Sequence, residues 1–350
     1  MEIITKRFEA GRDFNQLKGK VKEIGDVDQA CKVICEDIKS DKLPVGKCSI
    51  KDMFEALTTS TFPKAVGTLI NKSVIAGYET VPTIGQDLVT VVPSNKITET
   101  VVGFDEVDTP DIVLEGMPYG ETGFGEKYVT MKNIKRGRII SITEETIKFD
   151  QTGQVIQRAR MIGEKSALKK EQLIVEGVID ANSTVYKPSG IATAFYSTSA
   201  SPANATATVL GESGLDAVQV LVAAMTDANS DPILINEANM LLLTGSTLRR
   251  QAWELMNSPM TPEGAEGARN YFKGLYSLRY SPFVTSTTNY FIGDFKKDFW
   301  WTEVYPLQLL ERSMNDTDEG FKRDIIAQFK ARFYGAIGAV DNKHSFKGAA

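Results

Sequence analysis

The sequence predicts an α+β fold, because strand-like and helical segments occupy separate stretches of the chain. Residues 87–148 are rich in Val, Ile and Thr and follow the two-residue period of strands. The next segment, 151–180, contains no proline and many good helix formers, so it predicts one long helix. Near the end, 324–342 alternates strictly between apolar and polar residues, which predicts another strand.

Composition sets the broad class of protein. The 350 residues are 42% hydrophobic and 24% charged, as in an ordinary globular protein. A formal net charge of −5, spread over both signs, argues against a dedicated nucleic-acid binder. The opening residues are too charged for a signal peptide, and the longest apolar runs, 220–225 and 240–243, are too short for a membrane span. We therefore expect a soluble protein made in a cytoplasm.

The sequence predicts that the N-terminal part forms an arm followed by a helix. Residues 1–60 are charged, with short helices expected at 27–38 and 49–57, and they resemble an arm more than a compact domain. Residues 62–79 predict a longer helix that ends near Gly77. The apolar residues expected on one face of this helix are Val66, Leu69, Ile70 and Ile75.

A long excursion interrupts the strand-rich region. We expect strands at 87–93, 97–107, 127–134 and 137–147. Between the second and third of them lies 109–126, which contains two prolines and four glycines. Two strands around such an excursion predict an extended β-hairpin arm. A connection of this length is unusual in a compact domain and indicates a function.

The long helix predicted at 151–180 would reach roughly 42 Å if about 28 residues are helical. Its apolar contacts are expected from Ile156, Ala159, Ile162, Leu168, Leu173, Val175 and Val178. The basic residues on its other faces, Arg158, Arg160, Lys165, Lys169 and Lys170, are interpreted together with Lys330 and Arg332 as solvated or intersubunit residues. Weak, nonspecific contact with nucleic acid is the most that they suggest.

A smaller α/β subdomain is expected in the middle of the chain. Residues 196–213 are small and polar, which predicts a loop. A helix with Leu215, Val218, Leu221 and Met225 facing the core should follow. The apolar run 238–245 then predicts a buried strand, and Ser246 is expected to cap the next helix. An exposed loop is expected at 260–274.

The last hundred residues return to strands. The segment 290–311 is the most aromatic of the chain, and 324–342 is the strand with the clearest alternation. In that strand Ala327, Phe329, Ala331 and Phe333 should face one side and Gln328, Lys330, Arg332 and Tyr334 the other.

The motif GETGFGEK, residues 120–127, has the glycine spacing of a phosphate-binding loop but not its chemistry. Glu126 stands where the loop requires lysine, and Glu121 and Glu126 would repel phosphate. The residues that follow predict a strand, so no helix N-terminus would face the anion. We therefore reject a nucleotide site and interpret the glycines as flexible positions of a hairpin tip.

Candidate catalytic and metal-binding residues are few. The only histidine, His344, lies among charged residues and is interpreted as part of a solvated tail. Glu144 and Glu145 are adjacent on an expected strand and would point to opposite sides. Three cysteines, Cys31, Cys35 and Cys48, are interpreted as half-buried helix residues. We predict no catalytic residues, no metal site and no cofactor.

The order of these segments resembles the major capsid proteins of tailed bacteriophages, which have the Hong Kong 97-type fold. GRIISITEETIKFD before the long helix and KPSGI (187–191) after it are similar to family segments. The closing strands GDFKKDFWWTEVYPLQLLE and IAQFKARFYGAIGAVDNKHSF are similar as well. Phage Mu-like head subunits are the nearest members. The resemblance covers roughly residues 60–347, and none of its pieces is a strict motif.

The resemblance implies a division of the chain into the parts of that fold. Residues 1–69 would form the N-terminal arm, 98–135 the extended hairpin called the E-loop, and 190–274 the axial (A) domain. The peripheral (P) domain would comprise 70–97, 136–189 and 275–350, with 151–180 as its spine helix. The fold class is therefore expected to be α+β and Hong Kong 97-like.

The function implied by the resemblance is mechanical. Copies would assemble as hexamers and pentamers into an icosahedral shell around double-stranded DNA, in the virion, after assembly in the bacterial cytoplasm. Scaffolding protein, portal and decoration protein are the implied partners, with nonspecific contact to packaged DNA and no membrane. The expected intersubunit contact is the E-loop tip: Tyr119, Gly120, Glu121, Gly123, Phe124, Gly125, Glu126 and Lys127. Glu121 and Glu126 are candidates for pairing with basic residues of a neighbour.

Three alternatives stay open at this point. Some relatives crosslink an E-loop lysine to a neighbour's asparagine, for which Lys127 and Asn342 are candidates without a motif match; noncovalent assembly is the favoured state. An encapsulin-like shell holding an enzyme cargo is the runner-up in the same fold. A cytoplasmic α/β enzyme using carboxylates is a third, less favoured reading.

Overall fold

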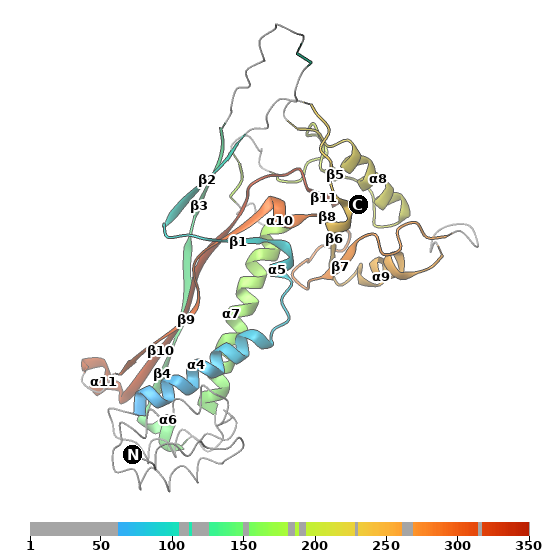
Figure 1. Ribbon diagram of the computed structural model, residues 1–350. Helices are drawn as coiled ribbons and strands as arrows, with labels where there is room; N and C mark the ends of the chain where they lie inside the picture. Colours follow the sequence, from blue (N-terminus) through green and yellow to red (C-terminus); the bar gives the residue numbers. More distant parts are fainter. Residues whose placement is uncertain are drawn as a thin grey trace, which may run out of the picture. The chain divides into compact units, whose positions relative to one another are not determined.

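The computed structural model describes residues 62–104, 112–113, 126–149, 154–180, 186–188, 194–227, 230–260, 269–313 and 317–349 (Figure 1). The first 61 residues of the expected arm, with its two short helices and the three cysteines, lie outside these ranges. The described residues form two compact units. The first unit takes in the residues up to Pro82, Lys135–Lys169 and Tyr305–Tyr334; the second takes in Thr83–Ile134, Lys170–Val304 and Gly335–Ala350.

Two helices form as the sequence predicts. Helix α4 spans Phe62–Thr80, and α7, the spine helix, spans Gln154–Val178. In the first unit α4 crosses the N-terminal half of α7 (Figure 1), and the crossing is close because Gly77 and Gly163 face backbone atoms of the other helix. Val66, Leu69 and Ile70 are buried as expected. Ile75 is not, since it is 45% exposed and Val74 is buried instead.

A four-stranded sheet has the order β1-β9-β10-β4. Its strands are β1 (Thr90–Pro93), β9 (Phe299–Ser313), β10 (Ile325–Ala339) and β4 (Ile134–Thr143). Strand β1 runs parallel to β9, with Thr90 opposite Trp300. The alternation predicted for β10 is confirmed, because Ala327, Phe329, Ala331 and Phe333 are all buried.

The strand expected at 137–147 ends earlier than predicted. Strand β4 stops at Thr143, and helix α6 (Glu144–Phe149) follows. The Thr143 hydroxyl oxygen accepts a hydrogen bond from the Thr146 backbone N–H at 3.3 Å, as a helix-capping residue does. Glu144 and Glu145 therefore lie in the first turn of a helix, where negative charge is favourable, and not on opposite sides of a strand.

The expected hairpin is confirmed in its described part. Strand β2 (Thr98–Phe104) pairs antiparallel with β3 (Glu126–Lys132), from Thr98 opposite Lys132 to Phe104 opposite Glu126. These two strands form a sheet of their own. The strand expected at 87–93 begins later than predicted, because a short helix, α5 (Gly85–Leu88), includes its first two residues and β1 starts at Thr90.

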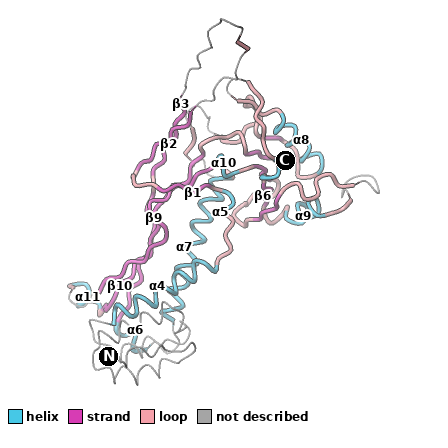
Figure 2. Tube along the Cα trace, viewed as in Figure 1, coloured by secondary structure: helices cyan, strands magenta, loops and turns pink. Residues whose placement is uncertain are grey.

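The remaining strands form a five-stranded sheet in the second unit, in the order β5-β11-β8-β6-β7. They are β5 (Ala205–Thr206), β11 (Ser345–Gly348), β8 (Tyr290–Gly293), β6 (Leu241–Thr244) and β7 (Ser277–Tyr280). Helices α8 (Glu212–Ala223) and α9 (Arg249–Asn257) lie beside this sheet (Figure 2). The 3-10 turn η2 (Glu237–Asn239) precedes β6 in the chain. The α/β subdomain predicted for the middle of the chain is thus present.

The core of this subdomain agrees with the sequence pattern, and one cap does not. Leu215, Val218 and Met225 are buried, and Leu221 packs against them. Ser246 does not cap α9, because the helix begins at Arg249 after a turn and its preceding residue, Leu248, makes no side-chain cap bond. The aromatic segment 290–311 contains two strands, because helix α10 (Phe295–Asp298) separates β8 from β9.

The first unit also contains the short helix α11 (Asp318–Arg323), which precedes β10. Within the described residues, no helix is both long enough and apolar enough to cross a membrane.

Candidate assembly surfaces

The β2–β3 hairpin is anchored at its root by a buried polar network. The Asn133 side-chain amide donates to the Lys96 carbonyl at 2.9 Å and to the Ser94 hydroxyl at 3.3 Å. Its carbonyl oxygen accepts from the Thr302 hydroxyl at 2.6 Å, which joins the root to β9. The Asn133 backbone N–H donates to the Ile97 carbonyl. Since Asn133 and Thr302 are buried, these bonds fix the root of the hairpin within the second unit.

Strand β3 has one buried and one exposed face. Val129 and Met131 are buried, and the Met131 side chain lies against Gly338 of β10. Between them, Thr130 contacts Thr100 on the exposed face at 3.3 Å. Tyr128 is 52% exposed and Val102, opposite it, is 50% exposed. The hairpin therefore presents apolar side chains that its own unit does not cover.

Most of the predicted tip lies outside the described residues. This holds for Tyr119, Gly120, Glu121, Gly123, Phe124 and Gly125. Glu126 and Lys127 begin β3, opposite Phe104 and Gly103, and only their backbone is described. Within the excursion, Ile112 is described and is 93% exposed. The contact made by the tip stays a prediction.

Within the second unit, charged groups hold the C-terminal half of the spine helix in place. Lys170 pairs with Glu303 at 2.7 Å and lies over the Trp301 ring, 5.3 Å from its centroid. The buried carboxylate of Glu171 accepts the backbone N–H groups of Ile84 and Gly85 at 3.0 and 2.9 Å. Burial raises the pKa of Glu171, and these two backbone hydrogen bonds oppose that rise.

The other basic residues of the spine helix face solvent in the described chain. Arg158, Lys165 and Lys169 are exposed, and Arg160 pairs with Glu164 along the helix at 3.3 Å. Exposed pairs of this kind contribute little to stability, so these residues do not hold the subunit together. Their location agrees with the expectation of solvated or intersubunit residues and does not distinguish between the two.

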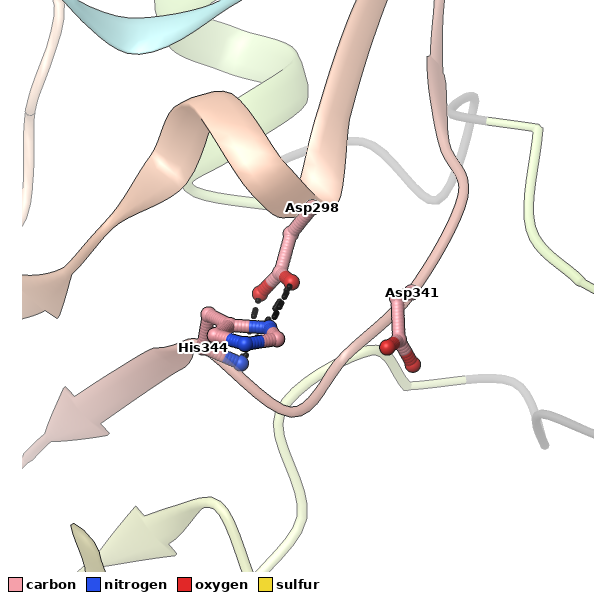
Figure 3. A group of neighbouring side chains, drawn as sticks. All are labelled: Asp298, Asp341 and His344. Carbon is pink, nitrogen blue, oxygen red and sulfur yellow. Dashed lines mark hydrogen bonds and ion pairs between the residues drawn. The ribbon is translucent and has the colours of Figure 1, made fainter. Parts of the chain in front are cut away.

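The sequence reading of His344 as a solvated tail residue is wrong. His344 directly precedes β11, its side chain is 17% exposed, and its Nδ1 lies 3.2 Å from an oxygen of the fully buried Asp298 (Figure 3). The His344 backbone N–H also donates to both Asp298 oxygens, at 3.3 and 3.1 Å. Burial raises the pKa of Asp298 to about 6. No local pattern indicates this contact, because 46 residues separate its partners.

Asp341 lies near this pair, and together the three side chains offer ligand atoms within 4.8 Å of one another (Figure 3). Two carboxylates and one imidazole are donors that transition metals accept. However, the Asp298 carboxylate is already held by the backbone and ring of His344, which links β11 to the end of α10. We therefore interpret this cluster as a structural connection.

Sequence reasoning missed an exposed aromatic and basic region on the α/β subdomain. A shallow groove of about 540 Å³ is lined by Ser246, Arg249, Arg250, Trp253, Leu278 and Tyr280. The Arg249 guanidinium lies over the Tyr280 ring at 4.7 Å, and Trp253 is 59% exposed. Trp and Arg are enriched at the centres of protein interfaces. Trp253 is therefore the residue from which a sequence analysis could have predicted this region.

A family model described as phage capsid protein matches residues 126–349, which is more than half of the chain. The chain belongs to this family. The match begins with the second strand of the hairpin and takes in the spine helix, the five-stranded sheet with its final strand β11, and the strands β4, β9 and β10 of the four-stranded sheet. The capsid protein therefore has, in the described residues, the succession of elements that the sequence resemblance implied.

Two of the solved structures that the chain is similar to, both capsids of GTA particles, support the same fold. The capsid of a native GTA particle is 11% identical, with a TM-score of 0.52 over 77% of this chain and 91% of that chain. The capsid of an empty GTA particle is 12% identical, with a TM-score of 0.50 over 76% and 89%. A chain of Microbacterium phage Oxtober96 is 13% identical, with a TM-score of 0.47 over 77% and 91%. The comparison with curated proteins found no match.

The protein is thus a phage major capsid protein with a Hong Kong 97-like fold. It is a structural protein of the virion capsid that assembles with copies of itself. The encapsulin-like reading is not favoured. For such a protein the functional sites are the surfaces that join one copy to the next, and the hairpin is the first candidate.

Proposed function

We propose that copies of this capsid protein form hexamers and pentamers of an icosahedral shell around the double-stranded DNA genome of a tailed phage, and that the hairpin joins neighbouring copies. The observation that carries the proposal is the hairpin itself. Its root is fixed by the buried Asn133 network, whereas Val102 and Tyr128 on its shaft are half exposed. An extended arm cannot bury such residues on its own, so a neighbouring surface is the natural partner.

The same proposal assigns the parts of the chain. Residues 1–69 act as the N-terminal arm, 98–135 as the E-loop and 190–274 as the A domain. The P domain comprises 70–97, 136–189 and 275–350. Assembly takes place in the host cytoplasm, with a separate scaffolding protein, a portal and in some shells a decoration protein as partners. Contact with packaged DNA is nonspecific.

Shortening the hairpin tests the role of the hairpin in assembly. Phe104 and Glu126 are opposite each other, so residues 105–125 are replaced by Asn-Gly, which closes a two-residue hairpin turn. A second variant replaces the same residues with a Gly/Ser segment of equal length. We expect both to fold with the secondary structure of the wild type by circular dichroism and to form no closed particles by electron microscopy. Closed particles of wild-type size from either variant would contradict the proposal.

We further propose that the shell is held together without covalent crosslinks. Neither of the two candidates for a crosslink, Lys127 and Asn342, lies in a matching sequence motif. Denaturing gel electrophoresis of purified particles should give a single band at the mass of one chain. A ladder of higher masses would overturn this part of the proposal.

A further inference from the structure

The N-terminal half of the spine helix carries a row of basic side chains on its exposed side. Arg158, Lys165 and Lys169 of α7 are exposed, and they are seven and four residues apart in the chain. At 3.6 residues per turn, these spacings place all three on one side of the helix. With a rise of 1.5 Å per residue, their Cα atoms span roughly 16 Å along the helix axis. We call these three residues the basic stripe.

The basic stripe lies on the side of α7 that faces away from α4 in the first unit. Helix α4 approaches α7 at Gly163, where a Cβ would meet the Val74 carbonyl oxygen. Ala159 and Ala167 are buried on this same side of the helix. Each residue advances an α-helix by about 100°, so the stripe lies on the opposite side from Gly163. Its side chains are therefore accessible to a ligand of the subunit.

The charge of the stripe is largely uncompensated in the described part of the first unit. From Gln154 to Lys169, α7 contains four basic residues and a single acidic one, Glu164. That carboxylate pairs with Arg160, which is outside the stripe, at 3.3 Å. Among the described residues, Arg158 forms no ion pair. The potential along this side of α7 is therefore positive, although the whole chain has a net charge of −5.

The chemistry of the stripe fits a phosphate backbone better than a protein surface. Lysine is depleted at the centres of protein interfaces, and aromatic residues are enriched there. The other exposed residues of α7 are Gln154, Gln157, Arg160 and Met161, none of them aromatic. Contacts to phosphate oxygens are made by lysine, arginine and polar side chains and need no apolar partner. Duplex DNA carries about one negative charge per 1.7 Å of its axis, so phosphates are available along the whole stripe.

We propose that the basic stripe of α7 binds the phosphate backbone of duplex DNA without regard to sequence. The inference rests on the proposed function, because it names the surface of the capsid protein that contacts the enclosed genome. Three side chains neutralise few phosphates, so the contact of one subunit is weak. Many copies facing one DNA molecule strengthen the contact by multivalency. Because each contact is electrostatic and carries no sequence information, the DNA can slide along the surface.

The salt dependence of DNA binding is the first test. Fluorescence anisotropy of a short labelled duplex, titrated with the unassembled chain, gives the binding constant at several salt concentrations. Each neutralised phosphate contributes about −0.9 to the slope of log K against log salt, so Arg158→Gln/Lys165→Gln/Lys169→Gln should reduce the slope by about 2.7. Its affinity in low salt should fall about tenfold or more. Glutamine is a good helix former and the three positions are exposed, so the variant should melt like the wild type.

Two matched variants control for net charge and for side-chain shape. Lys273→Gln/Lys322→Gln/Arg323→Gln removes the same charge at exposed positions outside α7 and should keep the wild-type slope. The exchange Arg158→Lys/Lys165→Arg/Lys169→Arg preserves the charge of the stripe and should keep the slope as well. The inference is overturned by a wild-type chain that does not bind the duplex in low salt, by an unchanged slope in the glutamine variant of the stripe, or by an equal loss in the first control.

Competition with polyglutamate is the second test, because it separates DNA from an acidic protein as the ligand. Duplex DNA carries about twice the charge per unit length of an extended polyglutamate chain. Unlabelled duplex should therefore displace the labelled duplex at a charge concentration about tenfold lower than polyglutamate requires. Displacement by polyglutamate at the same charge concentration would show that the stripe receives an acidic protein, and the inference would be wrong.

Both tests use the unassembled chain, so their outcome does not depend on shell formation. Shells formed by a chain whose stripe does not bind DNA would overturn the inference and leave the proposed function standing. A chain that binds DNA through the stripe and forms no shells under any assembly condition would overturn the proposed function, and the contact with an enclosed genome would fail with it.

Discussion

At the scale of single residues, Asp298 has the most unusual environment among the described acidic groups. Its carboxyl is fully buried, and burial raises its pKa from 3.8 to about 6. His344, Asp341 and Tyr196 are titratable groups close to it. Because the folded state holds the proton more tightly than the unfolded state, the stability from this group is greatest at low pH and is lost as the pH rises through about 6.

Asp298→Asn should therefore flatten the pH profile of stability. Asparagine keeps an acceptor for the His344 N–H but has no charge to bury. Between pH 4.5 and 7.5 the wild-type subunit should lose about 2 kcal/mol more of its unfolding free energy than the variant does. Urea unfolding of unassembled subunits measures this difference, with Asp294→Asn as the matched control. Identical pH profiles for wild type and Asp298→Asn would contradict the account.

Gly163 tests the crossing of α4 and α7. A Cβ at this position would meet the Val74 carbonyl oxygen and the Tyr78 backbone nitrogen. Alanine favours an isolated helix by about 1 kcal/mol, yet here it forces two backbones apart. We expect Gly163→Ala to lower the unfolding free energy by about 1–3 kcal/mol. Gln157→Ala, at an exposed position of the same helix, should change it little. A Gly163→Ala subunit as stable as the control would contradict the close contact between the backbones of α4 and α7.

The residues that the sequence misassigned share a physical cause. His344, Glu144 and Ser246 were each interpreted from their neighbours in sequence. His344 is placed by a carboxylate 46 positions away. Glu144 begins a helix because the Thr143 hydroxyl caps it. Ser246 lies in a turn, and the next helix begins only at Arg249. Local patterns do not encode such contacts.

At the scale of elements, a buried side chain of β3 holds the hairpin against β10, in addition to the Asn133 network at its root. Met131 is fully buried on β3 and lies against Gly338. Met131→Ala should leave a cavity and lower the unfolding free energy by about 2–4 kcal/mol. Thr130→Ala, on the exposed face of the same strand, is the control and should have a small effect. Chemical denaturation measures the unfolding free energy of both variant subunits. Equal losses in the two variants would show that the hairpin is not anchored through its buried face.

The second element-scale test concerns the link between α7 and α5. Glu171→Gln keeps the shape of the side chain but replaces one of the two accepting oxygens by an amide that cannot accept. One of the backbone N–H groups of Ile84 and Gly85 then lacks its partner, at a cost of about 1–3 kcal/mol. Glu176→Gln, which is half exposed, serves as control. Thermal melting should separate the two variants, and a stable Glu171→Gln subunit would contradict this role of the carboxylate.

Elements with strong periodicity were predictable. The spine helix, β10 and the paired hairpin strands agree with the sequence patterns within a few residues. Short elements were not, since the four-residue α5 and α10 and the strand β11 carry no period that a pattern can reveal. Strand β11 forms because β8 and β5 are available on either side of it, which is a property of the assembled sheet.

At the scale of the whole molecule, the order of elements identified the fold better than any motif did. GETGFGEK resembled a phosphate loop, whereas arm, hairpin, long helix, α/β middle and closing strands resembled a capsid protein, and the family match confirms the latter. The assembly surfaces were only partly predictable. The sequence predicts a hairpin tip, which stays a prediction, but no local pattern reveals that β4 and β10, about 190 residues apart, lie side by side.

The central claim is that closed shells form through a hairpin that reaches a neighbouring copy. Cryo-electron microscopy of particles assembled from the expressed chain tests it most directly. We predict closed icosahedral shells in which residues 105–125 of each subunit extend onto an adjacent copy. Particles in which this segment packs only against its own subunit, or a purified chain that remains a small oligomer under all assembly conditions, would contradict the account.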